Sequence, residues 1–368
     1  MRNTKIKSIL AIALSIILVF ALAGCGNSGE PNGSNDQIDG NGGSKQINLM
    51  TWGGDFIPRE IISQFEEKTG IKVNYKEVTS NEDMQSLLEA NPDQYDLAVV
   101  TDYMVDILRQ NGSLEKLDKS KLSNFSNINP VYQGNYYDEN NEYSIPYAVS
   151  ISFLLVNPEA VAALGADPIT SYKDLWQEEL KDKIVLIDWS VEIMGLVLKS
   201  LGYEYNETDP VKVAEAKEKL FELRDNIVRF ETNTPEDSLI NGEAVAGFMY
   251  SNQAVKGQAA DEKLEPVFPE EGMPIYIDSF VMSHKAPNRD HAYEFLNFIM
   301  EPEISARISV ITNFASTNSA AEEYLSEDFK NNPMLNLPDE VVENTSFYIN
   351  VAEVTEEYDH IYTEFKMR

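Results

Sequence analysis

Residues that could carry out catalysis are few and scattered in this 368-residue chain. The three histidines, His284, His291 and His360, lack the spacing of a metal site such as HExxH, which favours structural or surface roles. The sequence contains no GxSxG or GxGxxG run and no GxxxxGK followed by Ser or Thr. Those runs mark a nucleophile elbow, a dinucleotide site and a phosphate-binding loop. We therefore predict no catalytic constellation, no cofactor and no metal site.

Two further features bear on cation binding. The adjacent pair Tyr136-Tyr137 is of the type that ferric-ion-binding proteins use as phenolate ligands, although it lies in a turn rich in Asn, Asp and Glu. The chain carries 29 Lys and Arg against 61 Asp and Glu, a formal net charge of −32. Such a field repels nucleic acid and attracts a cationic small ligand, although acidic surfaces also serve solubility.

The first 24 residues have the layout of a secretory signal peptide. Arg2, Lys5 and Lys7 precede an uncharged apolar stretch from Ile9 to Ala23. The stretch ends in Leu-Ala-Gly-Cys25, which resembles the lipobox of bacterial lipoproteins, where the cysteine thiol receives diacylglycerol. We expect the mature protein to begin at Cys25 and to be held by lipid at the outer face of the membrane, or to be periplasmic. An ordinary signal peptide or a single membrane anchor is the alternative, although the stretch is short for a span.

Residues 25–46 are expected to form the lipidated cysteine and a flexible tether. The run after Cys25 is dominated by Gly, Asn and Ser and holds almost no large apolar residue, so it cannot offset the entropy of folding. Cys25 is the only cysteine, so no internal disulfide is possible and the domain must be stable through its core.

Elements typical of an α/β protein follow the tether. The apolar runs 47–52, 71–78 and 95–100 read as strands, and the segments 58–69 and 81–90 between them read as helices. Gly70 ends the first helix, and Ser80 with Asp83 three residues later opens the second. This alternation predicts a largely parallel sheet, and ligands of such sheets bind beyond the carboxyl ends of the strands. The loops to inspect therefore begin at Trp52 and Thr101.

A second α/β unit is expected after a long apolar run. The run from Ile145 to Asn157 is extended in character and could cross from one lobe to another. Behind it come strands at 183–188 and 244–251, helices at 192–202 and 210–224, and closing helices at 291–300 and in the C-terminal stretch.

An exported α/β chain without catalytic motifs looks like the binding protein of an ABC importer, and several runs make that resemblance more specific. They include TWGGDFIPREIISQFEEKTGIKVNYKEVTSNEDM, YDLAVVTDYMV, LGYEYNETDP, NGEAVAGFMYSN and PEEGMPIYIDSFVMS. In this order they resemble the spermidine/putrescine-binding proteins of bacterial polyamine importers, from about residue 47 to the C-terminus. The resemblance implies a ligand made of methylenes and ammonium groups, which requires carboxylates and aromatic faces.

The resemblance also implies ligand-binding residues in the first half of the chain. Trp52 matches the first tryptophan of the family's cleft, and Asp55 matches the acidic or polar position just after it. Gly53-Gly54 adds one residue to the usual spacing, which puts the match of Asp55 in doubt. Thr101 and Tyr103 match a hydroxyl and a tyrosine that follow the strand at 95–100. An N-cap and a core aromatic are the alternative roles for these two residues.

Matches in the second half include a departure from the family pattern. Glu192 matches a carboxylate that contacts an amine. Trp189 stands at a position that is usually acidic in spermidine-type members, so one charge partner is lost and an aromatic face is gained. Asp188 beside it could substitute for the missing acid.

The last matched positions lie toward the C-terminus. Tyr250 stands in place of a tryptophan. Tyr276 and Asp278 match an aromatic-x-Asp motif whose carboxylate binds an amine, and Asp278 is the strongest single candidate. Phe314 and Tyr348 match more loosely a tyrosine and a glutamine that contact the ligand.

The resemblance predicts a type II-like periplasmic-binding-protein fold with two lobes, each a mixed sheet flanked by helices, and the ligand in the cleft between them. We expect lobe 1 at residues 47–150 and 278–320 and lobe 2 at 151–277 and 321–368. The predicted function is capture of putrescine or spermidine by a monomer that performs no catalysis and delivers the ligand to an ABC permease. The alternatives are the same fold with a ferric ion, amino acid or sugar, or a surface enzyme or adhesin.

Overall fold

The computed structural model describes residues 45–336, 339–349 and 352–367. The predicted signal peptide and Cys25 lie outside these residues, as does all of the tether except its last two positions. Residues 44–368 form one compact unit. No helix in the described ranges is long and apolar enough to span a membrane.

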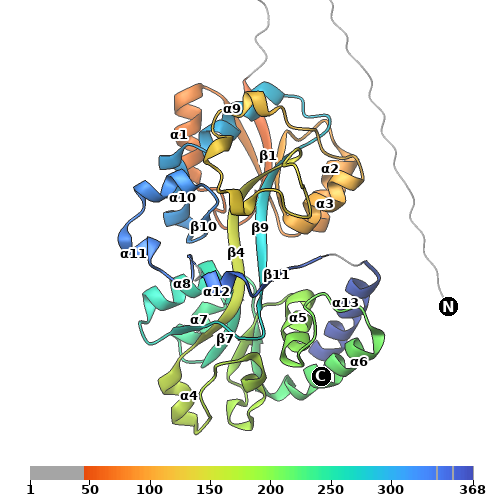
Figure 1. The fold of residues 1–368 in the computed structure, drawn as a ribbon, viewed down its shortest axis with the longest axis vertical. Helices are drawn as coiled ribbons and strands as arrows, with labels where there is room; N and C mark the ends of the chain where they lie inside the picture. Colours follow the sequence, from red (N-terminus) through yellow and green to blue (C-terminus); the bar gives the residue numbers. More distant parts are fainter. Residues whose placement is uncertain (1–44, 337–338, 350–351, 368) are drawn as a thin grey trace, which may run out of the picture. The chain divides into compact units, whose positions relative to one another are not determined.

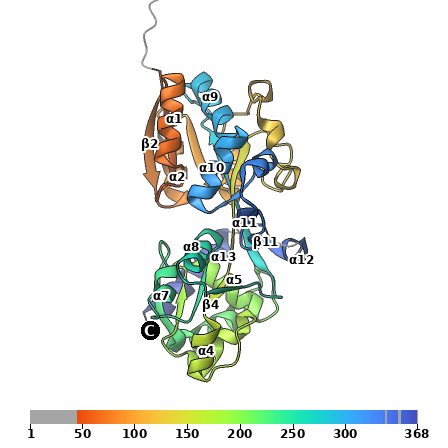
Figure 2. The same cartoon turned by 90° about the vertical axis from the view of Figure 1, so that its left-hand side faces the viewer.

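The first strands form the predicted parallel arrangement. Strand β1 (Gln46–Trp52) pairs in parallel with β2 (Lys72–Val78) and β3 (Leu97–Thr101). Helix α1 (Arg59–Thr69) buries Ile61, Ile62 and Phe65, and ends at Gly70 in the left-handed conformation. Helix α2 (Asn81–Ala90) begins after Ser80, whose hydroxyl accepts a hydrogen bond from the backbone N–H of Asp83. Figure 2 shows α1 and β2 side by side.

Two long strands, β4 (Ser144–Val156) and β9 (Met273–Met282), connect the rest of the sheet. Their antiparallel pairing runs from Ser144 to Ile151 of β4, after which β4 pairs with β7 (Ala246–Tyr250). On its other side β9 pairs with β3. Figure 1 shows β4 and β9 running side by side through the fold. The strand order is β2-β1-β3-β9-β4-β7-β5-β6. The mixed α/β fold predicted from the sequence is therefore present.

The remaining strands extend this sheet at its end or along β4 and β9. Their bounds are β5 Ile184–Leu186, β6 Ile227–Phe230, β8 Glu265–Val267, β10 Ala315–Ser316 and β11 Thr345–Phe347. The remaining helices are α3 Asp102–Gln110, α4 Pro158–Leu164, α5 Ser190–Ser200, α6 Pro210–Glu222, α7 Glu236–Ile240, α8 Ser251–Ala260, α9 Arg289–Ile299, α10 Pro302–Thr312, α11 Glu327–Lys330, α12 Asp339–Val342 and α13 Ala352–Lys366. Strands β4 and β9 lie within one sheet and one compact unit, and this unit by itself marks no boundary between two lobes. The residue limits of the two lobes therefore stay a prediction.

Most predicted elements agree with the structure to within a few residues. The sequence did not predict α3, which begins directly after Thr101, or α10, which follows the short break after α9. It also did not predict helices α4, α7, α8, α11 and α12. Thr101 does take the N-cap position of α3, but its side chain makes no capping hydrogen bond. Thr101 therefore occupies the N-cap position that the alternative role predicted, but its hydroxyl does not cap the helix and can bind another residue.

Helix α5 is buried along its first nine residues and packs closely against the loop that precedes α6. Gly195 faces the ring of Tyr205, and a Cβ placed on Gly195 would lie 2.1 Å from Cε2 of that ring. Tyr205 is itself buried and hydrogen-bonded to Glu192 on α5, so the ring has no open direction in which to move. Position 195 therefore requires a glycine because the Tyr205 ring leaves no room for a Cβ atom, and not because of its backbone conformation.

We predict that Gly195→Ala lowers the free energy of unfolding by about 1 to 3 kcal/mol, since an added methyl group overpacks the core. Urea denaturation checks this. The control is Gly53→Ala, whose Cβ would meet only the flexible end of Glu77 at 3.5 Å, and whose effect should stay within about 0.5 kcal/mol. Equal stability of Gly195→Ala and the parent would contradict the packing described.

Candidate functional site

The carboxylate of Asp278 accepts hydrogen bonds from residues at the ends of two strands. Asp278 lies within β9, directly opposite Thr101 at the end of β3. Its Oδ1 accepts a hydrogen bond from the hydroxyl of Thr101 at 2.9 Å and one from the indole Nε1 of Trp52 at 3.2 Å. Trp52 is the last residue of β1. The two loops selected from the sequence therefore meet at one buried acid.

Burial raises the pKa of Asp278 to about 6, although the hydrogen bonds from Thr101 and Trp52 oppose the shift. Only 9% of the residue is exposed. Among the described residues, no Lys, Arg or His lies within ion-pair distance of its carboxylate. Water removal without a counter-cation is costly for a carboxylate, so this position favours an external cation.

Asn81 links Thr101 to Tyr103 on the same side of the sheet. Its amide Nδ2 donates to Thr101 Oγ1 at 3.1 Å and to the Tyr103 hydroxyl at 2.9 Å. The Tyr103 hydroxyl donates in turn to Glu82 at 3.2 Å. Hydrogen bonds thus connect buried Asp278 with exposed Glu82, and they fix the orientation of the Tyr103 ring.

A second buried carboxylate, Glu192, lies in the first turn of α5. It accepts hydrogen bonds from Ser152 at 2.6 Å and from Tyr205 at 3.0 Å. The Tyr205 hydroxyl also lies 3.1 Å from that of Tyr276. Burial raises the pKa of Glu192 to about 7 against the effect of these hydroxyls. As with Asp278, no cationic side chain in the described ranges pairs with it.

Asp102, the first residue of α3, is a third buried acid. It accepts hydrogen bonds from the backbone N–H of Ile277 at 2.8 Å and from the Tyr136 hydroxyl at 3.2 Å. Burial raises its pKa to about 8; the Ile277 hydrogen bond opposes this, and the nearby charge of Asp278 adds to it. Burial thus favours the protonated form of Asp102, and Asp278, whose pKa is raised less, is the member of this pair that ionises first.

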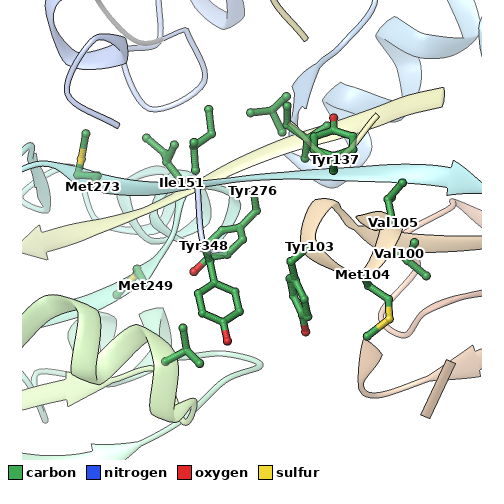
Figure 3. Packing of buried hydrophobic residues seen from close by; sticks show 14 of the residues in the cluster. Val100, Tyr103, Met104, Val105, Tyr137, Ile151, Met249, Met273, Tyr276 and Tyr348 are labelled. Atoms are coloured by element: carbon green, nitrogen blue, oxygen red, sulfur yellow. The ribbon is translucent and has the colours of Figure 1, made fainter. Parts of the chain in front are cut away.

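Five aromatic rings form a continuous row. Ring centroids lie 5.1 Å apart for Tyr103 and Tyr348, 5.9 Å for Tyr348 and Trp189, 5.8 Å for Trp189 and Tyr276, and 6.4 Å for Tyr276 and Tyr250. Figure 3 shows the rings of Tyr103, Tyr276 and Tyr348 gathered beside the crossing strands. This aromatic row presents π faces and edges of the kind that bind ammonium groups and the methylenes between them.

Two predicted residues lie apart from this cluster. Asp55 follows Gly54, and both residues have a positive φ in the turn after β1. Its side chain is 62% exposed and its Oδ1 lies 3.7 Å from Nε of Arg59, so it faces solvent. Phe314 packs edge-on against Phe56 with centroids 5.1 Å apart.

Asp188 does not substitute for an acid at position 189. Its carboxylate accepts hydrogen bonds from Lys366 Nζ at 2.7 and 2.8 Å and from the Tyr362 hydroxyl at 2.7 Å, both on α13. Desolvation opposes ionisation, but these two donors hold the pKa of Asp188 below its ordinary value. The position is therefore already neutralised within the protein.

The Tyr136-Tyr137 pair shows no ferric-site geometry. The Tyr136 hydroxyl donates to the backbone carbonyl of Tyr348 at 3.0 Å and contacts Asp102, while Tyr137 is fully buried. Burial raises the pKa of both phenols, which disfavours phenolates. In the part of the chain that the structure describes, no group of three or more His, Cys, Asp and Glu is arranged to hold a metal ion.

Three residues of the site were not predicted. Asn81 lies three residues after the end of β2, so the strand-end rule could have found it had it been applied to β2. Asp102 stands between two predicted residues, but nothing in the sequence shows that it is buried. Tyr205 reaches Glu192 only because α5 packs against its loop, and no sequence signal marks that contact.

Together, the fold and the paired carboxylates and rings define a solute-binding protein. The chain belongs to the family of bacterial extracellular solute-binding proteins, whose model matches residues 60–336. It is similar to the spermidine/putrescine-binding periplasmic protein of Escherichia coli K12, with 33% identity over 315 residues that cover 85% of this chain and 89% of the relative. The resemblance recognised in the sequence is confirmed.

Solved structures agree with this assignment. The spermidine/putrescine ABC transporter substrate-binding protein PotD of Streptococcus pneumoniae has a TM-score of 0.78 at 30% identity, covering 88% of this chain and 99% of that one. The TpPotD lipoprotein of Treponema pallidum has a TM-score of 0.78 at 27% identity, covering 88% and 100%. The periplasmic-binding-protein fold predicted from the sequence is therefore confirmed.

We predict that Asp278→Asn stabilises the ligand-free protein at pH 7 by about 1 to 3 kcal/mol, because the penalty of a buried charge disappears. An acid whose pKa is raised on folding lowers stability as pH rises from its unfolded pKa to its folded pKa of about 6. The gain should therefore be complete above pH 6 and vanish near pH 4.

Urea denaturation at pH 4 and pH 7, with protein lacking residues 1–25, measures this. Asp118→Asn is the control: hydrogen bonds from Ser120 lower the pKa of exposed Asp118, so its removal should not stabilise. An Asp278→Asn gain of the same size at both pH values would contradict the assigned cause.

Proposed function

We propose that this chain captures a polyamine, putrescine or spermidine, and delivers it to the permease of an ABC importer without catalysing a reaction. The observation that carries the proposal is the pair Asp278 and Glu192, two buried carboxylates without a cationic partner among the described residues. The names of the relatives support the same ligand class.

Each acid offers a site for one ammonium group. Asp278 is held by Trp52 and Thr101 through one oxygen, and Glu192 is held by two hydroxyls, so both carboxylates are oriented before a ligand arrives. Hydroxyl and indole donors stabilise the charges but do not neutralise them. A bound ammonium would add the missing charge, and its binding would lower the pKa of both acids.

The aromatic row suits the stem between the ammonium groups. Trp189, Tyr276 and Tyr348 offer apolar faces to methylenes and negative π faces to the ammonium groups, each cation–π contact contributing roughly 0.5 to 2 kcal/mol. We propose that Trp52, Thr101, Tyr103 and Tyr250 complete the ligand contacts. We do not extend the proposal to Asp55, Asp188 and Phe314, because each is occupied elsewhere.

We propose that the ligand is released and presented through movement of two lobes joined by β4 and β9. Thr101 and Tyr103 come from residues before β4, whereas Glu192 and Tyr250 come from residues after it. A ligand that contacts both sets binds best when they are close, and this differential affinity would shift the population to a closed form recognised by the permease.

We also propose that the mature protein is a monomer anchored by lipid on Cys25. The support is the Leu-Ala-Gly-Cys25 run after the apolar stretch, together with the likeness to a protein described as a lipoprotein. A tether at residues 26–46 would let the binding unit reach the permease.

Calorimetry on protein lacking residues 1–25 tests the ligand class. We expect micromolar or tighter binding of putrescine, spermidine or spermine, and none of arginine, whose carboxylate lacks a partner. Asp278→Asn should weaken binding by at least about 30-fold, as for a desolvated charge pair that loses one member. The control Asp118→Asn makes the same change in net charge at an exposed site and should bind normally. Absence of binding by every polyamine would overturn the proposed function.

Metabolic labelling with a fatty acid tests the anchor. In a bacterium that processes lipoproteins, the full-length chain should incorporate the label and fractionate with membranes, whereas Cys25→Ala should do neither. Label retained by Cys25→Ala would argue against this cysteine as the acceptor.

A further inference from the structure

The C-terminal helix α13 carries a polar stripe that the proposed site does not use. Thr355, Asp359, Tyr362 and Lys366 are spaced by four, three and four residues, which places them along one face of the helix. Neighbouring positions Ile361 and Phe365 are buried against the core shared with α5 and α6. Figure 1 shows α13 packed beside these two helices. We call these four residues the C-terminal stripe.

Each member of the C-terminal stripe is hydrogen-bonded either to a chain neighbour of Trp189 or to Tyr348. Lys366 and Tyr362 bind the carboxylate of Asp188, and Asp359 accepts a hydrogen bond of 2.5 Å from the Ser190 hydroxyl. Asp188 and Ser190 are the two neighbours of Trp189, so side chains of α13 are hydrogen-bonded to the side chains on both sides of that residue.

The same stripe reaches the next ring of the row. The Tyr348 hydroxyl lies 2.7 Å from Oγ1 of Thr355. Tyr348 contacts Trp189 and Tyr103, and its backbone carbonyl is held by Tyr136. One helix therefore fixes the two rings, Trp189 and Tyr348, at the centre of the aromatic row.

We propose that the C-terminal stripe positions Trp189 and Tyr348 for ligand binding, and that Lys366 and Asp359 set ligand affinity without touching the ligand. This inference rests on the proposed function for its ligand. Rings that are fixed before binding lose little conformational entropy when the ligand arrives, so anchors behind them contribute to affinity.

The effects of Lys366→Met on stability and on ligand affinity distinguish a positioning role of Lys366 from a purely structural one. Side chains of Lys366 and Asp188 are 38% and 37% exposed, and an ion pair of that exposure contributes about 0 to 1 kcal/mol to stability. Lys366→Met removes the ammonium group, whose Nζ also lies over the rings of Phe230 and Tyr362, and keeps most of the aliphatic stem. The melting temperature should therefore change little while binding weakens.

Electrostatics alone predicts the opposite sign. Loss of one positive charge makes the protein more attractive to a cationic ligand, so Lys366→Met would bind more tightly if Lys366 acted only through its field. Weaker binding by Lys366→Met would thus point to positioning of the rings.

A double-mutant cycle tests the inference, with calorimetry of the polyamine that binds the parent most tightly. We expect Lys366→Met to weaken binding about fivefold to tenfold, Lys366→Arg to restore it, and Lys366→Met to cost nothing further in a Trp189→Ala background. Lys219→Met is the matched control, because Lys219 also pairs with an acid and lies over a tryptophan ring, Trp176. Unchanged or tighter binding by Lys366→Met, or an equal loss in both backgrounds, would overturn the inference.

A ligand-free measurement separates this inference from the proposed function. The substitutions Trp52→Phe and Trp176→Phe leave Trp189 as the sole tryptophan of the chain. Acrylamide quenching of Trp189 should rise in Lys366→Met and in Asp359→Ala. If no polyamine binds but quenching rises, the proposed function fails and the positioning by α13 stands. Equal quenching in the parent and both variants would overturn the positioning.

Discussion

A carboxylate buried without a counter-cation is the constraint on which the rest of this structure depends. Asp278 lies within β9, its donors come from the ends of β1 and β3, and burial raises its pKa to about 6. Neutral donors such as the Thr101 hydroxyl and the Trp52 indole stabilise a charge but leave it uncompensated. The fold therefore holds an unfavourable charge in place, which is the arrangement expected of a receptor for cations.

Two acids near the site, Asp188 and Glu192, differ in whether the protein itself supplies a positive charge for the carboxylate. Asp188 is neutralised by Lys366, accepts a hydrogen bond from Tyr362, and joins the segment just before α5 to α13. Among the described residues, Glu192, four residues later, receives only hydroxyl donors and remains available. Two acids of the same sequence segment thus differ in role because different donors contact them. The C-terminal helix α13 supplies the lysine that pairs with Asp188 and, in the part of the chain that the structure describes, supplies none to Glu192.

The aromatic row is built from elements that are far apart in sequence. Tyr103 follows β3, Trp189 precedes α5, and Tyr348 follows β11. Because ring contacts are edge-on or tilted, each ring supports the next while leaving faces for other contacts. The acids supply the charge that a cation requires, and the rings supply a surface that excludes water.

The sequence alone determined many of the elements, the family and most of the residues that meet at the site, but not helices such as α3, α8 and α10. Apolar periodicity, Gly70 and Ser80 fixed the first strands and helices, because these signals act between neighbours along the chain. Trp52, Thr101 and Asp278 followed from strand ends and from resemblance. The tertiary structure alone decided that Asp55 faces solvent, that Asp102 and Tyr205 belong beside the site, and that Asp188 is paired with α13. Burial and charge pairing depend on residues distant in the chain, and no local pattern encodes them.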